Sequence, residues 1–258
     1  MSCLDKIKEK VEKKELVVGT MLQSNDSCIA ELFGRVGYDF VWIDAEHGPL
    51  DKGDILKMIM AAQGAGIAAF VRVAWNDPVL VKPIIDMGAD GIIFPMTFNA
   101  EDARRAVRSC LYPPAGNRSS GPIRVISYGF DNELEYIKKS DSSIWKILQI
   151  EHIDAVNNLD EILSVEGIDT IHVGPWDLSG SIGLLAQTEH PEVQKLCDII
   201  EKKVKEHRIP FGAGTGPDVK SVEKWVARGV SWVNVSADYE LLVKSASEIL
   251  REVRNLKK

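Results

Sequence analysis

Residues 39–50 read DFVWIDAEHGPL, a short apolar run that ends in Asp44, Glu46 and His47 before a Gly-Pro pair breaks the chain. A run of this length, rich in aromatic and β-branched residues, is typical of a strand that is buried on both faces. Three ionisable side chains directly after such a strand are costly to bury unless they have a task. The stretch therefore indicates a parallel strand that delivers chemical groups at its carboxyl end.

The same pattern recurs along the whole chain. Eight apolar runs alternate with longer helical patterns, and the runs cover residues 15–22, 40–44, 68–73, 91–95, 144–151, 168–174, 209–214 and 230–236. Eight strand–helix units in about 250 residues are typical of a (β/α)8 barrel, the TIM barrel. The main alternative is a doubly wound open sheet. That fold is expected to carry a Gly-rich turn after its first strand, and GTMLQSND (19–26) is not a GxGxxG motif.

The segments between the runs carry the start and stop signals of helices. Helices are predicted over residues 28–37, 77–88, 99–110 and 217–229, with a charged amphipathic helix at the amino terminus and an apolar-faced helix over residues 239–253. Residues 111–132, rich in Pro, Gly and Arg, read as a long loop. No change in composition marks a second domain, so we predict one α/β domain, a (β/α)8 barrel, over residues 1–258.

Composition limits the possible partners and location. The chain is 45% hydrophobic and 27% charged, with a formal net charge of −7, which argues against a nucleic-acid partner. No stretch approaches the ~20 apolar residues of a membrane span. The four cysteines are far apart and form no CxxC pair, which is typical of a reduced protein of the cytoplasm. We therefore expect a cytoplasmic protein with no membrane partner.

Polar residues gather where the predicted strands end, which is where TIM barrels carry their active sites. Arg72 ends the third strand, Gln149 and Glu151 end the fifth, and Asp177 follows the sixth. Gln149 and Glu151 are two residues apart, so both are expected to face into the barrel. Each residue alone is more often solvated or ion-paired than functional. Their coincidence with His47 at one end of the barrel favours a shared site.

The other histidines receive a plainer interpretation. His152, His172, His190 and His207 are interpreted as surface, capping or helix-flanking residues without a role in the site.

Two carboxylates with open positions suit a hard divalent cation such as Mg²⁺ or Mn²⁺, and the lack of a second His or of a Cys disfavours zinc. A 2-oxo acid would chelate such a cation, Arg72 would neutralise charge on the same oxygens, and His47 would move a proton near neutral pH. This combination fits enolate chemistry. The alternative, a Schiff base, needs a lysine at the barrel mouth, whereas Lys146 stands near the start of the fifth strand.

Several stretches resemble the HpcH/HpaI aldolases, the metal-dependent class II pyruvate aldolases. They are WIDAEHGP (42–49), VRV (71–73), DMGADGIIFPM (86–96), YPPAGNR (112–118), QIE (149–151), NLDEILSVEGID (158–169) and GPWDLSGSIG (174–183). As a set these motifs are specific, although no single one is. The resemblance implies reversible cleavage of a 4-hydroxy-2-oxo acid to pyruvate and an aldehyde, with Mg²⁺, Mn²⁺ or Co²⁺ as cofactor.

The resemblance also implies a role for individual residues. It assigns the general base to His47, the enolate-stabilising charge to Arg72, the metal ligands to Glu151 and Asp177, the substrate contacts to Gln149 and Trp176, and the partner of the histidine to Asp86. Two positions depart from the family pattern, Ser119 in the long loop and the bulky Trp176. Both are expected to border the acceptor pocket, so the identity of the aldehyde stays open.

Asp86 presents a geometric conflict. It ends a helix, and a helix of this barrel runs antiparallel to the strands, so Asp86 is expected at the end of the barrel opposite His47. Either Asp86 only ends its helix, or it reaches the His47 of a neighbouring subunit. We favour the second, because the resemblance implies a homo-oligomer, a hexamer, and the helix over residues 239–253 offers apolar surface for assembly. The alternatives for function are an acyl-CoA ester lyase of the citrate-lyase-like branch and a non-catalytic barrel.

Overall fold

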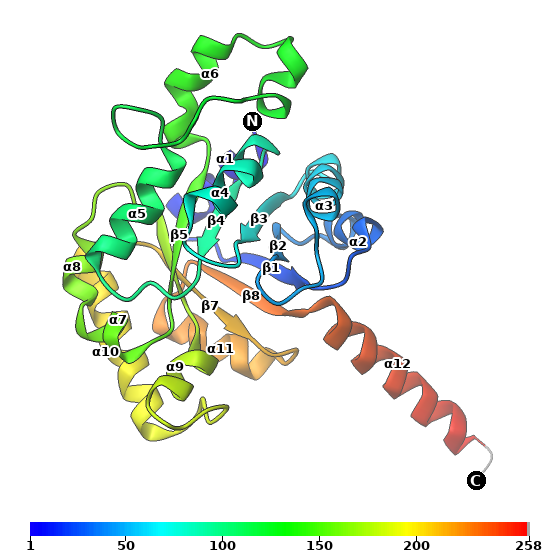
Figure 1. The fold of residues 1–258 in the computed structure, drawn as a ribbon. Helices are drawn as coiled ribbons and strands as arrows, with labels where there is room; N and C mark the ends of the chain where they lie inside the picture. Colours follow the sequence, from blue (N-terminus) through cyan, green and yellow to red (C-terminus); the bar gives the residue numbers. More distant parts are fainter. Residues whose placement is uncertain (257–258) are drawn as a thin grey trace.

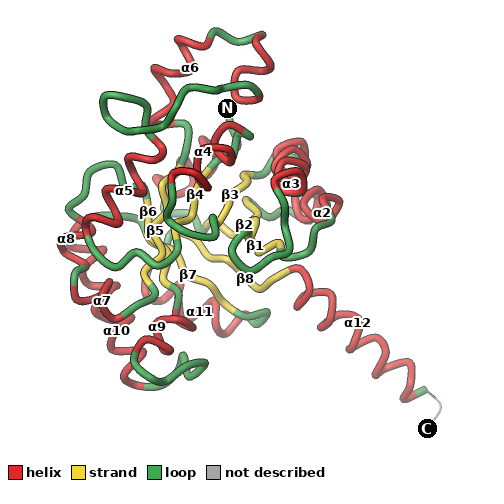
Figure 2. Tube along the Cα trace, in the orientation of Figure 1, coloured by secondary structure: helices red, strands yellow, loops and turns green. Residues whose placement is uncertain are grey.

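The strand β2 (Phe40–Asp44) is buried along its whole length and pairs in parallel with a strand on each side. In the computed structural model, which describes residues 1–256, this pairing continues until β8 returns to β1 and closes a barrel of eight parallel strands. Figure 2 shows the strands at the centre and the helices around them. The predicted (β/α)8 barrel is confirmed.

The strands occupy the predicted apolar runs. Their bounds are β1 Val17–Leu22, β2 Phe40–Asp44, β3 Ala68–Arg72, β4 Gly91–Phe94, β5 Trp145–Ile150, β6 Thr170–Val173, β7 Phe211–Thr215 and β8 Trp232–Ala237. Because side chains alternate along a strand, each run supplies two buried layers. On β2, Val41 and Ile43 pack under the helices, as do the outward-facing residues of the other strands. Phe40 and Trp42 face the other way and fill the barrel together with inward-facing residues of other strands and Leu4 of the first helix.

The helices follow the strands in order (Figure 1). Their bounds are α1 Cys3–Glu12, α2 Ser27–Val36, α3 Lys52–Gly64, α4 Pro78–Asp86, α5 Ala100–Cys110, α6 Glu133–Lys139, α7 Ile153–Asn157, α8 Leu159–Leu163, α9 Pro175–Ser181, α10 Pro191–His207, α11 Val219–Arg228 and α12 Asp238–Asn255, with the short 3-10 helices η1 Arg124–Gly129 and η2 Ser140–Ser142. The four helices expected between strands and both terminal helices are confirmed. Asp26, Asp77 and Asn99 cap the helices that follow them by accepting backbone amide hydrogen bonds.

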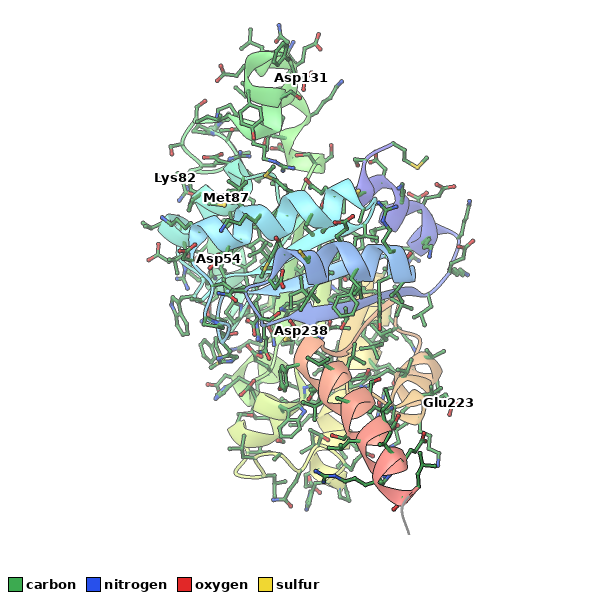
Figure 3. All side chains as sticks on the ribbon, turned by 90° about the vertical axis from the view of Figure 1, so that its right-hand side faces the viewer. Asp54, Lys82, Met87, Asp131, Glu223 and Asp238 are labelled. Atoms are coloured by element: carbon green, nitrogen blue, oxygen red, sulfur yellow. The ribbon has the colours of Figure 1, made fainter. Side chains whose placement is uncertain are left out.

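The long connection between α5 and β5 forms an insertion that projects from the barrel in Figure 1, and Asp131 marks it in Figure 3. The part predicted as a loop, residues 111–132, is mostly irregular and contains η1, and the rest of the insertion includes α6 and η2. Arg118 anchors it, because this fully buried guanidinium donates to Asp86 at 2.8 Å and to the Tyr136 hydroxyl at 3.1 Å and stacks on Tyr112. Ser119 therefore lies near the amino ends of the strands. Its expected place at the border of the acceptor pocket stays a prediction, since Arg118 beside it binds Asp86, the residue expected to reach a neighbouring subunit.

The helix α12 does not pack along the barrel wall but extends away from it, as Figure 1 shows, and Asp238 marks its start in Figure 3. Along its length Leu242, Val243, Ile249, Leu250 and Val253 are all exposed. Separately, none of the helices in residues 1–256 combines the length and the apolar character that crossing a membrane requires.

The tight interior of the barrel makes a prediction about stability. A Cβ atom on Gly212 would stand 2.2 Å from the indole of Trp232, whereas one on the exposed Gly64 would meet no atom within 4 Å. Gly212→Ala should therefore lower stability by about 1–3 kcal/mol through overpacking, and Gly64→Ala should leave it unchanged or slightly raised. Thermal unfolding followed by circular dichroism measures both, and equal melting temperatures for the two variants would contradict the packing described.

Candidate active site

Asp44 and Arg72 are register partners on β2 and β3 and form a buried ion pair. Arg72 Nε donates to Asp44 Oδ1 at 2.9 Å, and Nη2 donates to Oδ2 at 2.8 Å. Burial alone would raise the pKa of Asp44, but the hydrogen bonds and charge of Arg72 outweigh it and hold this pKa below its ordinary value. The two-point contact fixes the guanidinium in one orientation, with Nη1 not engaged by Asp44.

Asp44 also organises the loop that follows β2. Its Oδ1 accepts the backbone N–H groups of Glu46 and His47 at 3.2 and 3.3 Å, and its Oδ2 accepts the Gln23 carboxamide at 2.8 Å. Glu46 in turn lies 3.1 Å from Arg72 Nε and 3.8 Å from His47 Nε2. The structure thus brings His47 and Arg72 to the two sides of Glu46, while the His47 side chain stays 63% exposed and accessible to a ligand.

Glu151 directly follows β5 and is almost fully buried, as is Gln149 on the same inward face. The Glu151 carboxylate accepts the backbone N–H of Met96 at 2.8 Å. Burial, reinforced by the negative charges of Asp177 and Glu46, raises the pKa of Glu151 to about 8. The predicted inward orientation of Gln149 and Glu151 is confirmed.

Gly174, at the end of β6, allows these two side chains to reach the site. A Cβ atom there would stand 2.8 Å from Glu151 Oε2 and 3.0 Å from Gln149 Nε2, so a larger residue would displace both groups. The chain then turns into α9, where Asp177 stands exposed in the first turn. The close approach that glycine permits therefore places Glu151 beneath the helix that carries Asp177.

The donor set at this end of the barrel fits a divalent cation. Glu46, Glu151 and Asp177 act on one another through their negative charges, and the nearest cation, Arg72, is already paired with Asp44 and Glu46. Carboxylate oxygens are the ligands that Mg²⁺ and Mn²⁺ prefer. Among residues 1–256 no group of three or more His, Cys, Asp and Glu side chains is placed so that it could hold a metal ion. Two carboxylates alone would leave positions on a cation for water and for a chelating ligand.

Trp176 and Asp86 lie apart from the buried groups of the site. Trp176, beside Asp177, is 62% exposed and stands at the rim of the site. Asp86 ends α4 and is bound to Arg118, away from the His47 of its own chain, as the direction of the helix predicts. Lys146 is held by Asp169 at 2.8 Å near the start of β5. No Schiff-base lysine therefore comes from this strand at the mouth.

Among the histidines, three confirm the plain interpretation and one does not. His152 and His190 cap α7 and α10, and His207 pairs with Asp160 at the surface. The fourth, His172, is buried inside the barrel against Trp42, so its interpretation as a surface, capping or helix-flanking residue is wrong. The alternation of side chains along β6 indicates the inward position of His172, because Ile171 and Val173 on either side of it pack under the helices.

Several known proteins resemble this chain in sequence and in fold. The family model described as HpcH/HpaI aldolase/citrate lyase matches residues 18–245. The 2-dehydro-3,6-dideoxy-6-sulfogluconate aldolase of Pseudomonas putida is 34% identical over 242 residues, 93% of this chain and 93% of that protein. The 4-hydroxy-2-oxo-heptane-1,7-dioate aldolase of Shigella flexneri is 32% identical over 243 residues, 92% of this chain and 89% of that protein. A crystal structure of a family member from Burkholderia cenocepacia has a TM-score of 0.90 at 28% identity, covering 97% of this chain and 99% of that chain.

The buried ion pair makes a prediction about stability. Asp44→Ala would leave the Arg72 guanidinium buried with only Glu46 beside it, and should cost about 3–5 kcal/mol of unfolding free energy. The double variant Asp44→Ala/Arg72→Met should cost less than the sum of the two single variants, because no unpaired charge remains. Urea unfolding of all four proteins measures the coupling. Strictly additive losses would show that the two side chains do not act as a pair.

Proposed function

This chain belongs to the HpcH/HpaI aldolase/citrate lyase family, and from that premise we propose that it is a carbon–carbon lyase that reversibly cleaves a 4-hydroxy-2-oxo acid to pyruvate and an aldehyde. Two relatives that match over most of their length are named aldolases, which favours this reaction over an acyl-CoA ester lyase or a non-catalytic barrel. The observation that carries the proposal is the convergence of Arg72, Gln149 and Glu151, all buried, with His47 at one end of the barrel.

Glu151 and Asp177 would hold the divalent cation, Mg²⁺, Mn²⁺ or Co²⁺. When bound, such a cation supplies positive charge to the carboxylate and keto oxygens of the 2-oxo acid. Gln149 lies on the same inward face, where its carboxamide would donate to the substrate, and Trp176 would contact the aldehyde part from the rim. Arg72 presents the nitrogen that Asp44 does not occupy, Nη1, to the oxygen on which the enolate charge grows.

His47 would move the proton of the 4-hydroxyl group. In the cleavage direction it accepts this proton as the C4–O bond becomes the carbonyl of the aldehyde and the C3–C4 bond breaks. The electron pair of that bond forms the enolate of pyruvate, and addition of a proton at C3 then gives pyruvate. Charge grows beside Arg72 during this step, so the ion pair with Asp44 matters because it holds the guanidinium in place before the reaction begins.

The site would be completed by assembly. We propose a homo-oligomer, a hexamer by family resemblance, in which the exposed apolar side chains of α12 pack against another subunit. In such an assembly Asp86, held by Arg118, would face the His47 of a second copy and fix the tautomer of its imidazole. The cytoplasm is the location we propose for this oligomer.

The first test is metal dependence. Pyruvate release from a panel of 4-hydroxy-2-oxo acids, coupled to lactate dehydrogenase, should cease after chelation and return with Mg²⁺, Mn²⁺ or Co²⁺. Glu151→Gln and Asp177→Asn keep the side-chain shapes and should not recover with these cations at concentrations that restore the parent. Full activity of the parent after exhaustive chelation would rule out a metal-dependent aldolase.

The second test concerns the proton. His47→Ala should retain pyruvate binding but lose roughly 10²–10⁴-fold in cleavage rate, because the positioned base is gone. His190→Ala is the matched control, since this histidine only caps α10 and its loss should leave cleavage unchanged. A His47→Ala protein within a few-fold of the parent would remove His47 from the mechanism.

The third test is subunit mixing. His47→Ala and Asp86→Ala should each be nearly inactive. When they are unfolded and reassembled together, roughly a quarter of the sites in a closed oligomer should combine an intact His47 from one chain with an intact Asp86 from another. Recovery of pyruvate release measures these sites. Hybrids, verified by mass spectrometry, that stay as inactive as both parents would refute a shared site.

A further inference from the structure

The interior of the barrel holds buried polar atoms that have no partner among residues 1–256. Gln149 Oε1, both ring nitrogens of His172, and Asn234 Oδ1 make no hydrogen bond, although each side chain is at least nine-tenths buried. Unpartnered buried polar atoms are rare in folded proteins and usually bind ordered water. We call Gln149, His172 and Asn234 the polar belt.

The three residues of the polar belt lie on neighbouring parts of the barrel wall. Gln149 on β5 and His172 on β6 are register partners, and Asn234 on β8 is the register partner of Gly214 on β7. On β7 the register partner of His172 is Gly212, but the imidazole also reaches Gly214, two residues further along the same face, where a Cβ atom would stand 3.5 Å from Nε2. Within the polar belt, Gln149 and His172 are therefore direct neighbours, and Asn234 lies beyond Gly214 on β8.

The imidazole of His172 is held in place by packing rather than by hydrogen bonds. Its ring centroid lies 4.7 Å from that of Trp42 and 5.3 Å from that of Trp232. The indole N–H of Trp232 is already satisfied, since it donates to Thr170 Oγ1 at 2.9 Å. Burial, with a smaller effect from the positive charge of Arg72, lowers the pKa of His172 to about 3. The ring is thus neutral near pH 7, with one nitrogen that donates and one that accepts.

Gly214 leaves room for a methyl group beside the imidazole. A methyl group on Gly214 would meet only the His172 ring, at 3.5 Å from Nε2, and no other atom within 4 Å. The nitrogen end of the Gln149 carboxamide lies on the Gly174 side, 3.0 Å from the position of a Cβ atom there, and its oxygen is buried and makes no hydrogen bond within residues 1–256. A buried water with two to four polar partners could join these groups.

We propose that bound water links His172 to the carboxamide oxygen of Gln149, and that His172 is thereby a positioning residue that turns the Gln149 amide nitrogen toward the 2-oxo acid. The inference rests on the proposed function, in which Gln149 contacts the substrate. Water in such a position gives a hydrogen bond nearly as strong as a direct one. His172 does not touch the substrate and acts only through Gln149.

A double-mutant cycle tests this link. His172→Phe keeps an aromatic ring against Trp42 but removes both nitrogens, and should raise KM for the 2-oxo acid roughly two- to tenfold with kcat nearly unchanged. His172→Gln, which restores a donor and an acceptor, should recover part of the loss. In a Gln149→Leu background, His172→Phe should have no further effect on KM. Additive effects on KM, or a His172→Phe protein with the KM of the parent, would overturn the proposal.

Gly214→Ala gives a second test that removes no functional group. Its methyl would occupy the space beside His172 Nε2 in which we place the water, so it should raise KM as His172→Phe does. Gly64→Ala, on the exposed end of α3, is the matched control and should leave KM unchanged. If His172→Phe fails to fold, Gly214→Ala alone tests the proposal. A Gly214→Ala protein that binds substrate like the parent overturns the proposal.

A high-resolution crystal structure of the unmodified protein separates the link from the proposed function. It should show water within about 2.7–3.2 Å of both a His172 nitrogen and Gln149 Oε1. A polar belt without water would overturn the proposal even if the protein is an active aldolase. Water in the belt of a protein that releases no pyruvate from any 4-hydroxy-2-oxo acid would keep the link and refute the function.

Discussion

The buried pair of Asp44 and Arg72 is the constraint on which the rest of the site depends. It arises because β2 and β3 place the two residues in register at the carboxyl ends of the strands, where both side chains face into the barrel. Neither charge is tolerable there without the other, since an unpaired buried ion costs several kcal/mol. The pair therefore fixes the free side of the guanidinium and, through the remaining hydrogen bonds of Asp44, the loop that carries Glu46 and His47.

The charge balance around this pair explains why the site suits a cation and an anionic ligand together. Arg72 alone does not neutralise Asp44, Glu46, Glu151 and Asp177, and the buried Glu151 has its pKa raised by burial and by two of these neighbours. A divalent cation would remove that repulsion, and its open positions would accept the oxygens of a 2-oxo acid. Gly174 is part of the same arrangement, because only a residue without a side chain leaves room for Glu151 and Gln149.

Much of this could be predicted from the sequence, because alternation along a strand is a local property. The eight apolar runs located the strands, and the spacing of Gln149 and Glu151 gave their shared inward face. The same parity, applied to Ile171 and Val173, would also have placed His172 inside the barrel.

Other features depend on contacts that a single segment does not encode. The pairing of Asp44 with Arg72 follows from the register between two strands, which hydrophobic pattern alone does not set for strands buried on both faces. The bond between Asp86 and Arg118 joins a helix end to an irregular insertion. The helix α12 begins directly after β8 and extends away from the barrel, whereas its sequence indicated only an apolar face.

The central claim is that this end of the barrel stabilises the enolate of pyruvate, and exchange of the pyruvate methyl protons tests it without knowledge of the aldehyde. Pyruvate would be incubated in deuterium oxide with the protein and Mg²⁺, and the loss of its methyl signal would be followed by proton nuclear magnetic resonance. The account predicts rapid, protein-dependent exchange that ceases after chelation and falls sharply in Arg72→Ala. A methyl signal that decays no faster than without protein, or at the same rate in Arg72→Ala, would contradict it.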